Sequence, residues 1–430
     1  MKLFDLALKM KGFPLDEAKS DLNFIREQLK SNLNFIEERK TDIVNYHLKN
    51  NPFYQQKVKK FSVWEDLPVL TKKDLQQPLE NRLSKGYTKE NIYINKTSGS
   101  SGDPFIFAID KKCHALTWAN YVRLFGQYGI DFNKDLQARF YGIPLDFMGS
   151  KKERIKDFFS FRYRFNIFEL NDSAFEKYVE VFSKKRFVYI NGYTSSIVLF
   201  ASYLRDKAII LNKVCPTLSA CFVTSEMLSI EDRELLEAQF QVPIVNEYGA
   251  SELGIIAFEN VAKSWMLNQE TLFVEVVDDN NKPLPYGAEG KILISSLYNR
   301  AHPFIRYEIG DRGIINLQKN ELILEKLTGR TNDFALLSDG SKVPALTFYY
   351  ITKSIIKDTA KVKEFVVKQK SENIFLVEYV AKDDLTTEEK EAIRAAFKQY
   401  VSAGLEITID RKNEIKRTKS GKLKQFERLF

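Results

Sequence analysis

Short apolar runs that alternate with helical stretches constrain the fold of this 430-residue chain most strongly. The runs are Phe187–Ile190, Ala220–Val223 and Ile244–Val245, and stretches such as 229–239 separate them with helical periodicity. Strands that are apolar on both faces are typical of a parallel sheet with helices on both sides. We therefore expect an α/β fold whose large N-terminal domain contains mixed and parallel sheets flanked by helices.

Two other regions differ from this central part. Residues 1–90 are mostly helical in pattern, because apolar residues recur three to four positions apart. Near the C-terminus, Thr386 and Glu389 form the pattern of a capping box, which predicts a helix between short strands. We expect an N-terminal domain over residues 1–330 and a small, mobile α+β C-terminal domain over residues 331–430.

The composition argues against several classes of protein. The net charge of +8 is spread along the chain, and its densest basic stretch, Arg411–Arg428, lacks the interleaved aromatic residues of nucleic-acid sites. No segment has the roughly 18 uninterrupted apolar residues of a membrane span. The 3 cysteines form no paired motif, which is typical of a reducing compartment. We expect a cytoplasmic protein without a nucleic-acid partner or a transmembrane segment.

A loop rich in glycine and hydroxyl side chains lies between two expected strands, 91–95 and 104–109. Its glycines allow close approach of the backbone to an oxyanion, and successive amides and hydroxyls can donate hydrogen bonds to phosphate. The loop lacks the Gly-Lys-Ser/Thr of a Walker motif and leads into a strand. A polar hairpin is the alternative interpretation. The candidate phosphate ligands are Thr97, Ser98, Gly99, Ser100, Ser101 and Gly102.

Two motifs place polar side chains after apolar segments. In Glu247–Glu252, which follows the expected strand 244–245, Tyr248 offers a ring for a base and Ser251 a donor for phosphate. Glu252 is a hard oxygen ligand suited to Mg²⁺. Asp311 follows an expected glycine turn, where its carboxylate can accept from two ribose hydroxyls. Each motif alone also fits an ordinary loop or turn.

Two basic residues occupy positions that suit a moving domain. Arg330 lies at the expected domain boundary, where the short polar residues up to Asp333 make a plausible hinge. Lys422 follows a glycine in the tail. A lysine on a mobile domain can neutralise charge at a transferring phosphate. A solvated basic tail is the alternative for this segment.

The five motifs, in this order, resemble the signatures of the adenylate-forming superfamily of acyl-CoA synthetases, adenylation domains and luciferases. The resemblance covers about residues 50–425. The segments Asn51–Tyr54, Leu67–Leu75 and Asn191–Ser196 are similar to the phenylacetate–coenzyme A ligase branch, and more closely to its CapK-like members of capsular polysaccharide biosynthesis.

This resemblance implies a role for each matched residue. The loop holds the β- and γ-phosphates of ATP, Tyr248 stacks on adenine, Asp311 binds ribose and Lys422 promotes adenylation. Asn332 falls at the hinge position. The implied nucleotide site comprises Thr97, Ser98, Gly99, Ser100, Ser101, Gly102, Glu247, Tyr248, Gly249, Ser251, Asp311 and Arg330. The implied catalytic residues are Lys422, Glu252 (the Mg²⁺ ligand) and Arg330, and the implied acyl pocket contains Tyr141, Phe147, Tyr193, Ser225 and Ala250.

The expected function is that of an ATP-dependent carboxylic acid ligase, which forms an acyl-adenylate, releases pyrophosphate and then transfers the acyl group to CoA. One alternative acceptor is an amine or carrier in cell-surface polysaccharide biosynthesis. A catalytically degenerate nucleotide-binding protein is the alternative from another class. The resemblance implies ATP and Mg²⁺ as cofactors. We expect no zinc, because Leu253–Glu275 contains neither Cys nor His.

Overall fold

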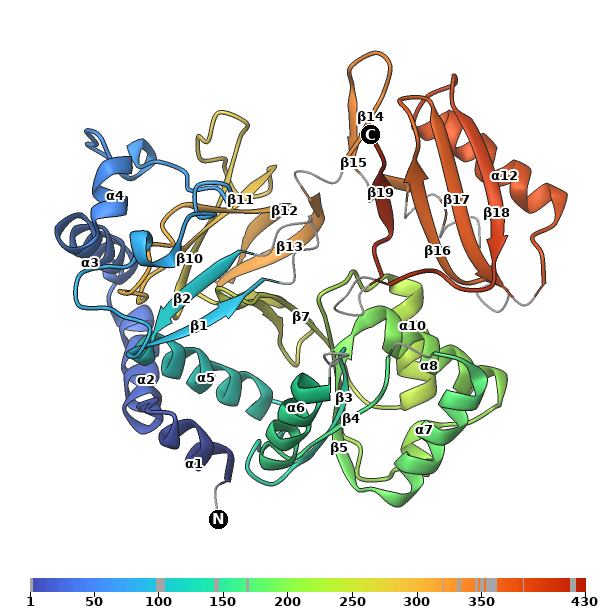
Figure 1. The fold of residues 1–430 in the computed structure, drawn as a ribbon, viewed down its shortest axis with the longest axis horizontal. Coiled ribbons are helices and arrows are strands. Elements are labelled where there is room, and N and C mark those ends of the chain that lie inside the picture. Colours follow the sequence, from blue (N-terminus) through green and yellow to red (C-terminus); the bar gives the residue numbers. More distant parts are fainter. Residues whose placement is uncertain are drawn as a thin grey trace.

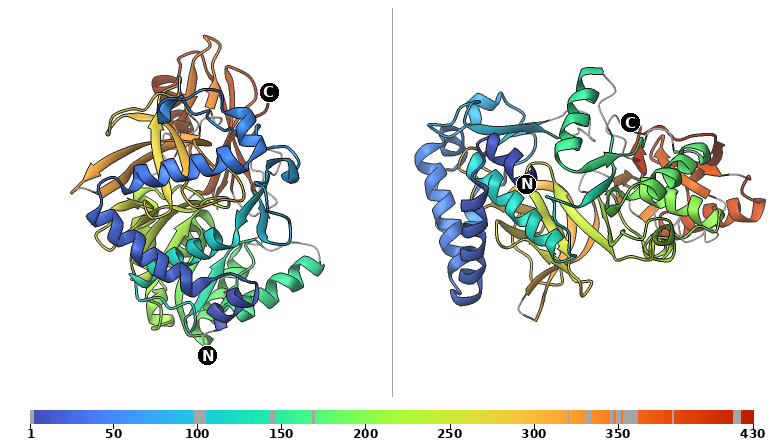
Figure 2. Two further views of the ribbon diagram at one scale, coloured as in Figure 1. Left: turned by 90° about the vertical axis from the view of Figure 1, so that its left-hand side faces the viewer. Right: turned by 90° about the horizontal axis from the view of Figure 1, so that it is seen from below.

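The structure is a computed structural model of the chain. It describes residues 3–97, 105–142, 147–167, 170–319, 321–330, 334–344, 347–348, 352, 362–381, 383–417 and 423–430, with the side chains of 147–152, 330, 334, 342, 344, 363 and 400 left out. The N-terminal helices and the C-terminal sheet lie at opposite ends of its long axis (Figures 1 and 2).

The largest sheet of the described residues has eleven strands in the order β10-β11-β12-β13-β9-β8-β7-β6-β5-β3-β4. Strands β3 to β7 run parallel and the other neighbours run antiparallel, which confirms the expected mixed α/β fold. The strands are β3 (Leu136–Phe140), β4 (Arg162–Arg164), β5 (Phe187–Tyr193), β6 (Ala220–Thr224), β7 (Ile244–Ala250), β8 (Gly254–Glu259), β9 (Trp265–Leu267), β10 (Leu272–Val277), β11 (Glu289–Ser296), β12 (Tyr307–Gln318) and β13 (Glu321–Arg330).

Helices cover both faces of the parallel strands, as the apolar runs predicted. On one face Phe200 of α8 is fully buried against Phe140 and Phe182. On the other, Phe125 of α5 stacks on Phe222 of β6 with ring centroids 4.1 Å apart. The helices of this part are α1 (Leu3–Met10), α2 (Leu15–Ser31), α3 (Phe35–Asn50), α4 (Pro52–Lys57), α5 (Lys111–Gly126), α6 (Phe147–Phe159), α7 (Asp172–Lys184), α8 (Thr194–Asp206), α9 (Leu211–Val214) and α10 (Ile230–Phe240).

Two segments that the sequence placed in loops lie in strands, so those expectations were wrong. Strand β7 continues through Ala250 because the antiparallel neighbour β8 pairs with it, and Gly254 lies opposite Ala250. The close approach explains Gly249, since a Cβ there would lie 2.8 Å from the Gly254 carbonyl oxygen. Likewise Asp311 follows no turn: it lies within β12, which β11 and β13 hold on both sides.

The loop at 98–104 joins a separate antiparallel pair, β1 (Ile92–Lys96) and β2 (Ile106–Asp110). The base of this loop is closed, because the Thr97 amide donates to the Phe105 carbonyl (3.0 Å) and the Phe105 amide donates to the Thr97 hydroxyl (3.1 Å). The loop itself lies outside the described residues.

The C-terminal part has its own sheet and its own apolar core. Thr386 and Glu389 form the predicted capping box at the start of α12. The boundary near residue 330 stays a prediction. The elements are β14 (Phe334–Leu336), β15 (Lys342–Pro344), β16 (Val362–Gln369), β17 (Ile374–Ala381), α12 (Thr387–Tyr400), β18 (Glu406–Lys412) and β19 (Phe426–Arg428), with the larger sheet in the order β18-β17-β16-β19. Within the described ranges, no helix combines the length and apolarity that crossing a bilayer requires.

Candidate active site

Three of the predicted nucleotide-site residues meet where β7 and β12 approach each other. The Tyr248 hydroxyl donates to an Asp311 carboxylate oxygen at 2.7 Å. Asp311 pairs across the sheet with Arg330, the last residue of β13. Tyr248 and Asp311, which are 63 positions apart in the chain, therefore lie side by side in the folded protein. The aromatic ring, the carboxylate and the end of β13 form one polar edge.

Glu252 lies beside this edge in a buried position. It is 7% exposed, and its Oε1 accepts a hydrogen bond from the Tyr307 hydroxyl at 3.1 Å. Tyr307 begins β12 and its ring lies 6.4 Å from Phe105, which closes the base of the glycine-rich loop. The loop base, Glu252 and the strand that carries Asp311 thus belong to one packed unit.

Burial raises the pKa of Glu252, and the neighbouring charge of Asp311 raises it further. The Lys72 ammonium acts in the opposite direction and favours the ionised form. In the described part of the chain no group of three or more His, Cys, Asp or Glu side chains is placed to hold a metal ion. A single carboxylate beside a polyphosphate is nevertheless a usual arrangement for Mg²⁺, which takes most of its remaining ligands from phosphate and water. Glu252 fits that role.

Four of the implied acyl-pocket residues, Tyr141, Tyr193, Ser225 and Ala250, lie at the carboxyl ends of neighbouring parallel strands, and Phe147 begins α6. The rings of Tyr141 and Tyr193 are 4.8 Å apart. Ser225 follows β6 directly with a φ of 70°, and Ala250 ends β7. Carboxyl ends of parallel strands are where open α/β sheets bind ligands. Ser251 lies exposed in the turn after Ala250.

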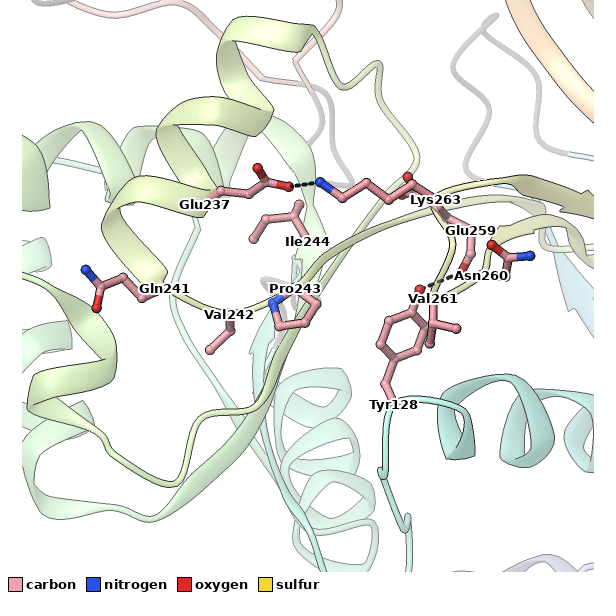
Figure 3. A pocket seen from close by; sticks show the side chains of 10 residues that line it. All are labelled: Tyr128, Glu237, Gln241, Val242, Pro243, Ile244, Glu259, Asn260, Val261 and Lys263. Atoms are coloured by element: carbon pink, nitrogen blue, oxygen red, sulfur yellow. Dashed lines mark hydrogen bonds and ion pairs between the residues drawn. The ribbon is translucent and has the colours of Figure 1, made fainter.

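A hollow of about 440 Å³ lies at the opposite end of the parallel strands (Figure 3). Its walls come from the segment 241–244, at the start of β7, and from 259–263. The ion pair between Glu237 and Lys263 spans it at 3.0 Å. None of the predicted site residues lines this hollow, so we do not place the chemistry there.

The C-terminal tail is tied to the N-terminal part through one carboxylate. Glu226 accepts from the Ser195 amide at 2.7 Å and from the Leu423 amide at 2.9 Å. Arg417 donates to the Ser195 hydroxyl at 3.1 Å and forms an ion pair with Glu364. We call these four residues and Leu423 the tail latch. Glu226 belongs to the segment after β6, and its carboxylate lies at the N-terminal end of α8. Unpaired amides and the helix dipole favour an anion there.

Several predicted residues fall outside what the structure describes. These are Ser98, Gly99, Ser100, Ser101, Gly102, Asn332 and Lys422, together with the side chains of Phe147 and Arg330. Their roles stay predictions.

The sequence analysis predicted no role for Lys72 or Tyr307, and it did not predict that Glu226 holds the tail. Tyr307 lies in the segment Arg306–Asp311, which ends with the predicted ribose ligand, and Lys72 lies in the segment 67–75 that carried the family resemblance. Position in a motif was thus the available signal for those two. Nothing local marked Glu226, since its partners are 31 and 197 positions away.

Comparison with known proteins bears on the fold and on the family resemblance. No family model matches the chain. Protein CapK from Staphylococcus aureus is 25% identical over 321 residues, which cover 68% of this chain and 66% of CapK, so the match spans slightly less than two thirds of the relative. A crystal structure of 2-hydroxyisobutyryl-CoA ligase in the postadenylation state superposes with a TM-score of 0.69 and 16% identity, covering 91% of this chain and 88% of the ligase. The amide bond synthetase McbA from Marinactinospora thermotolerans gives a TM-score of 0.53 at 14% identity, covering 78% and 69%.

The chain therefore has the fold of the adenylate-forming superfamily. The chain is also similar to CapK, a protein of the branch that the segments near residues 51, 67 and 191 resemble.

Proposed function

We propose that this protein is an ATP-dependent ligase that activates a carboxylic acid as an acyl-adenylate. The proposal rests on one observation: Tyr248, Asp311 and Glu252 lie close together, next to the base of the glycine-rich loop. A ring for adenine, an acceptor for ribose and a carboxylate for Mg²⁺ are the groups that ATP needs.

In the proposed reaction a substrate carboxylate attacks the α-phosphate of ATP, an acyl-phosphate bond forms and pyrophosphate leaves. The transition state accumulates negative charge, so the protein mainly supplies positioning and fixed positive groups. Lys422 is the proposed cation of the tail, and bound Mg²⁺ neutralises phosphate charge. The reaction requires no protein nucleophile.

The acyl group is then transferred to a second substrate with release of AMP. We propose CoA as this acceptor, since a solved relative is a CoA ligase. An amine or carrier in cell-surface polysaccharide biosynthesis is the second candidate, which the amide bond synthetase relative and the similarity to CapK favour.

Exchange of labelled pyrophosphate into ATP, measured with a panel of carboxylic acids, tests the first step. We expect acid-dependent exchange with at least one member of the panel. AMP release on addition of CoA, or of an amino sugar, then separates the two acceptors. Absence of exchange with every acid, together with ATP binding that is unchanged in Glu252→Ala, would rule out the enzymatic proposal.

Replacing Glu252 by glutamine is expected to weaken the dependence on Mg²⁺ while the fold persists. The change removes the charge and keeps an oxygen for Tyr307. The Mg²⁺ concentration for half-maximal exchange should rise by about 10- to 100-fold, the usual effect of altering a metal site's carboxylates or their partners. Glu234→Gln, an exposed carboxylate on α10, serves as the matched control. An unchanged Mg²⁺ dependence would show that Glu252 does not face the metal.

Removing the tail latch is expected to slow adenylation specifically. Glu226→Ala deletes the acceptor for both amides, so the residue after Lys422 loses its anchor. We expect pyrophosphate exchange to fall by about tenfold, in line with the loss of one charge-assisted hydrogen bond. Acyl transfer from a prepared acyl-adenylate should be unchanged, because that step uses another orientation of the tail. Lys416→Ala, an exposed neighbour of Arg417, is the control, and equal slowing of both steps would contradict the assignment.

A further inference from the structure

A polar cluster lies behind the implied acyl pocket, on the face of the sheet that α5 and α6 cover. Gln137, Arg139 and Tyr141 alternate along β3 and its end, so their side chains share one face. Asn191 of β5 lies beside them: its Oδ1 accepts from the Gln137 amide at 3.1 Å and from the Tyr141 hydroxyl at 3.2 Å. Gln137 is 3% exposed, and its Oε1 has no partner.

The cluster contains positive charge that forms no ion pair with a carboxylate of the described residues, although Glu153, Asp157 and Glu247 act on Arg139 from farther away. The Arg139 guanidinium lies 4.1 Å from the centre of the Tyr141 ring, and the buried Nε atoms of Arg139 and Arg162 have no hydrogen-bond partner. Burial and the neighbouring Arg162 charge lower the pKa of Arg139 to about 10, so it stays protonated at neutral pH. Arg164, the next basic residue on β4, is by contrast held by Asp157 at 2.7 Å. Arg139 is partly exposed, and a partly buried guanidinium without an ion pair gains from a ligand that pairs with it.

The sheet register connects this polar cluster to the edge at which Tyr248 and Asp311 lie. Tyr193 pairs with Thr224, and Thr224 pairs with Glu247, which precedes Tyr248 on β7. Tyr141 touches Tyr193, so one row of side chains leads from Tyr141 to the strand that carries the predicted adenine contact.

Glu247 is the last residue of this row, and its carboxyl group is only partly ionised at neutral pH. Its Oε1 accepts from the Thr224 hydroxyl at 3.3 Å, and because neighbouring residues of a strand point to opposite faces, it lies away from Tyr248. Burial raises the pKa of Glu247 to about 7, while the charge of Arg139 lowers it. The carboxylate thus offsets the charge of Arg139 and Arg162 only in part, and this end of the pocket suits an anion.

We infer that the acid activated by this protein carries a second anionic group, and that Arg139 binds it. The substrate class is that of dicarboxylic acids and their polar derivatives, one carboxylate reacting with ATP while the other pairs with the guanidinium. The stacked ring of Tyr141 fixes the plane of the guanidinium. This inference rests on the proposed function and restricts the class of carboxylic acids that the pocket accepts.

The test compares matched acids in pyrophosphate exchange: a dicarboxylic acid, the monocarboxylic acid of the same length with a terminal methyl group, and the hydroxy acid between them. We expect the dicarboxylic acid to have a kcat/KM about 10- to 100-fold above the methyl analogue, the discrimination typical of a charge-assisted hydrogen bond. Arg139→Gln should remove most of this preference through KM, with kcat for the methyl analogue little changed. Arg139→Lys should retain part of it, and Arg205→Gln, on the surface of α8, should retain all of it.

Two results would overturn the inference. One is a preference for the methyl analogue in the unaltered protein, and the other is a loss in Arg139→Gln that lowers kcat equally for all three acids. Calorimetric binding of the dicarboxylic acid, in the presence of a non-hydrolysable ATP analogue, separates failure of the inference from failure of the proposed function. Binding that Arg139→Gln abolishes, without exchange in any protein, would refute the ligase and keep the anion site; no binding would refute the site.

Discussion

Replacing Lys422 by alanine is expected to lower ATP–pyrophosphate exchange by about 10²- to 10³-fold, the effect of removing one fixed group that stabilises transition-state charge. The attacking carboxylate and the triphosphate are both anions, and the lysine would offset the charge that builds on the α-phosphate. Substrate binding should change much less, because the ammonium acts mainly in the transition state. The measurement is the exchange rate at saturating ATP and acid, with Lys424→Ala as the matched control.

The same variant should distinguish the two half-reactions. Acyl transfer from a prepared acyl-adenylate is expected to continue at the unaltered rate, because phosphate chemistry is already complete. If the tail latch acts through Lys422, the double variant Glu226→Ala/Lys422→Ala should be no slower than Lys422→Ala alone. Additive losses would show that Glu226 affects catalysis by another route, and a loss of less than about tenfold in Lys422→Ala would remove this lysine from the mechanism.

The largest expected effect on stability belongs to Arg306. Its side chain is buried, and its guanidinium forms an ion pair with Glu275 at 2.9 Å. It also donates to the carbonyl oxygens of Glu65, Leu67 and Asn281, so it joins three segments to β12. Arg306→Met would leave the buried Glu275 carboxylate without its cation and three carbonyls without this donor, and of the described residues Trp64 alone would still donate to the carboxylate. The free energy of unfolding, from urea titration, should fall by about 3–5 kcal/mol.

A second substitution checks the cause of this loss. Adding Glu275→Leu to Arg306→Met removes the unpaired carboxylate and should restore part of the stability. Arg312, on β12, forms a partly exposed ion pair with Asp279. Arg312→Met breaks this pair and should lower the free energy of unfolding by about 0–1 kcal/mol. Equal effects of Arg306→Met and Arg312→Met would contradict the importance of the buried pair.

The motif residues were accessible from the sequence because each depends on local chemistry. Glycine and hydroxyl residues at 97–102, a tyrosine before Gly249 and a carboxylate at 252 need no tertiary information to suggest phosphate, base and metal contacts. The same holds for the capping box of α12, whose two hydrogen bonds join residues three positions apart. The ends of strands were harder to predict from the sequence. Strand β7 continues beyond Val245 because it pairs with β8, and that pairing depends on residues outside β7 itself.

The sequence by itself determined the fold class and the candidate groups for ATP, since apolar periodicity and the order of the motifs can be read along the chain. Only the tertiary structure decided which residues those groups contact. The Tyr248–Asp311 hydrogen bond spans 63 positions, and the Glu226 latch spans 197. That Arg139 forms no ion pair among the described residues became visible only when the tertiary structure placed the carboxylates around it. Charge pairing depends on distance in space, and a sequence records distance along the chain alone.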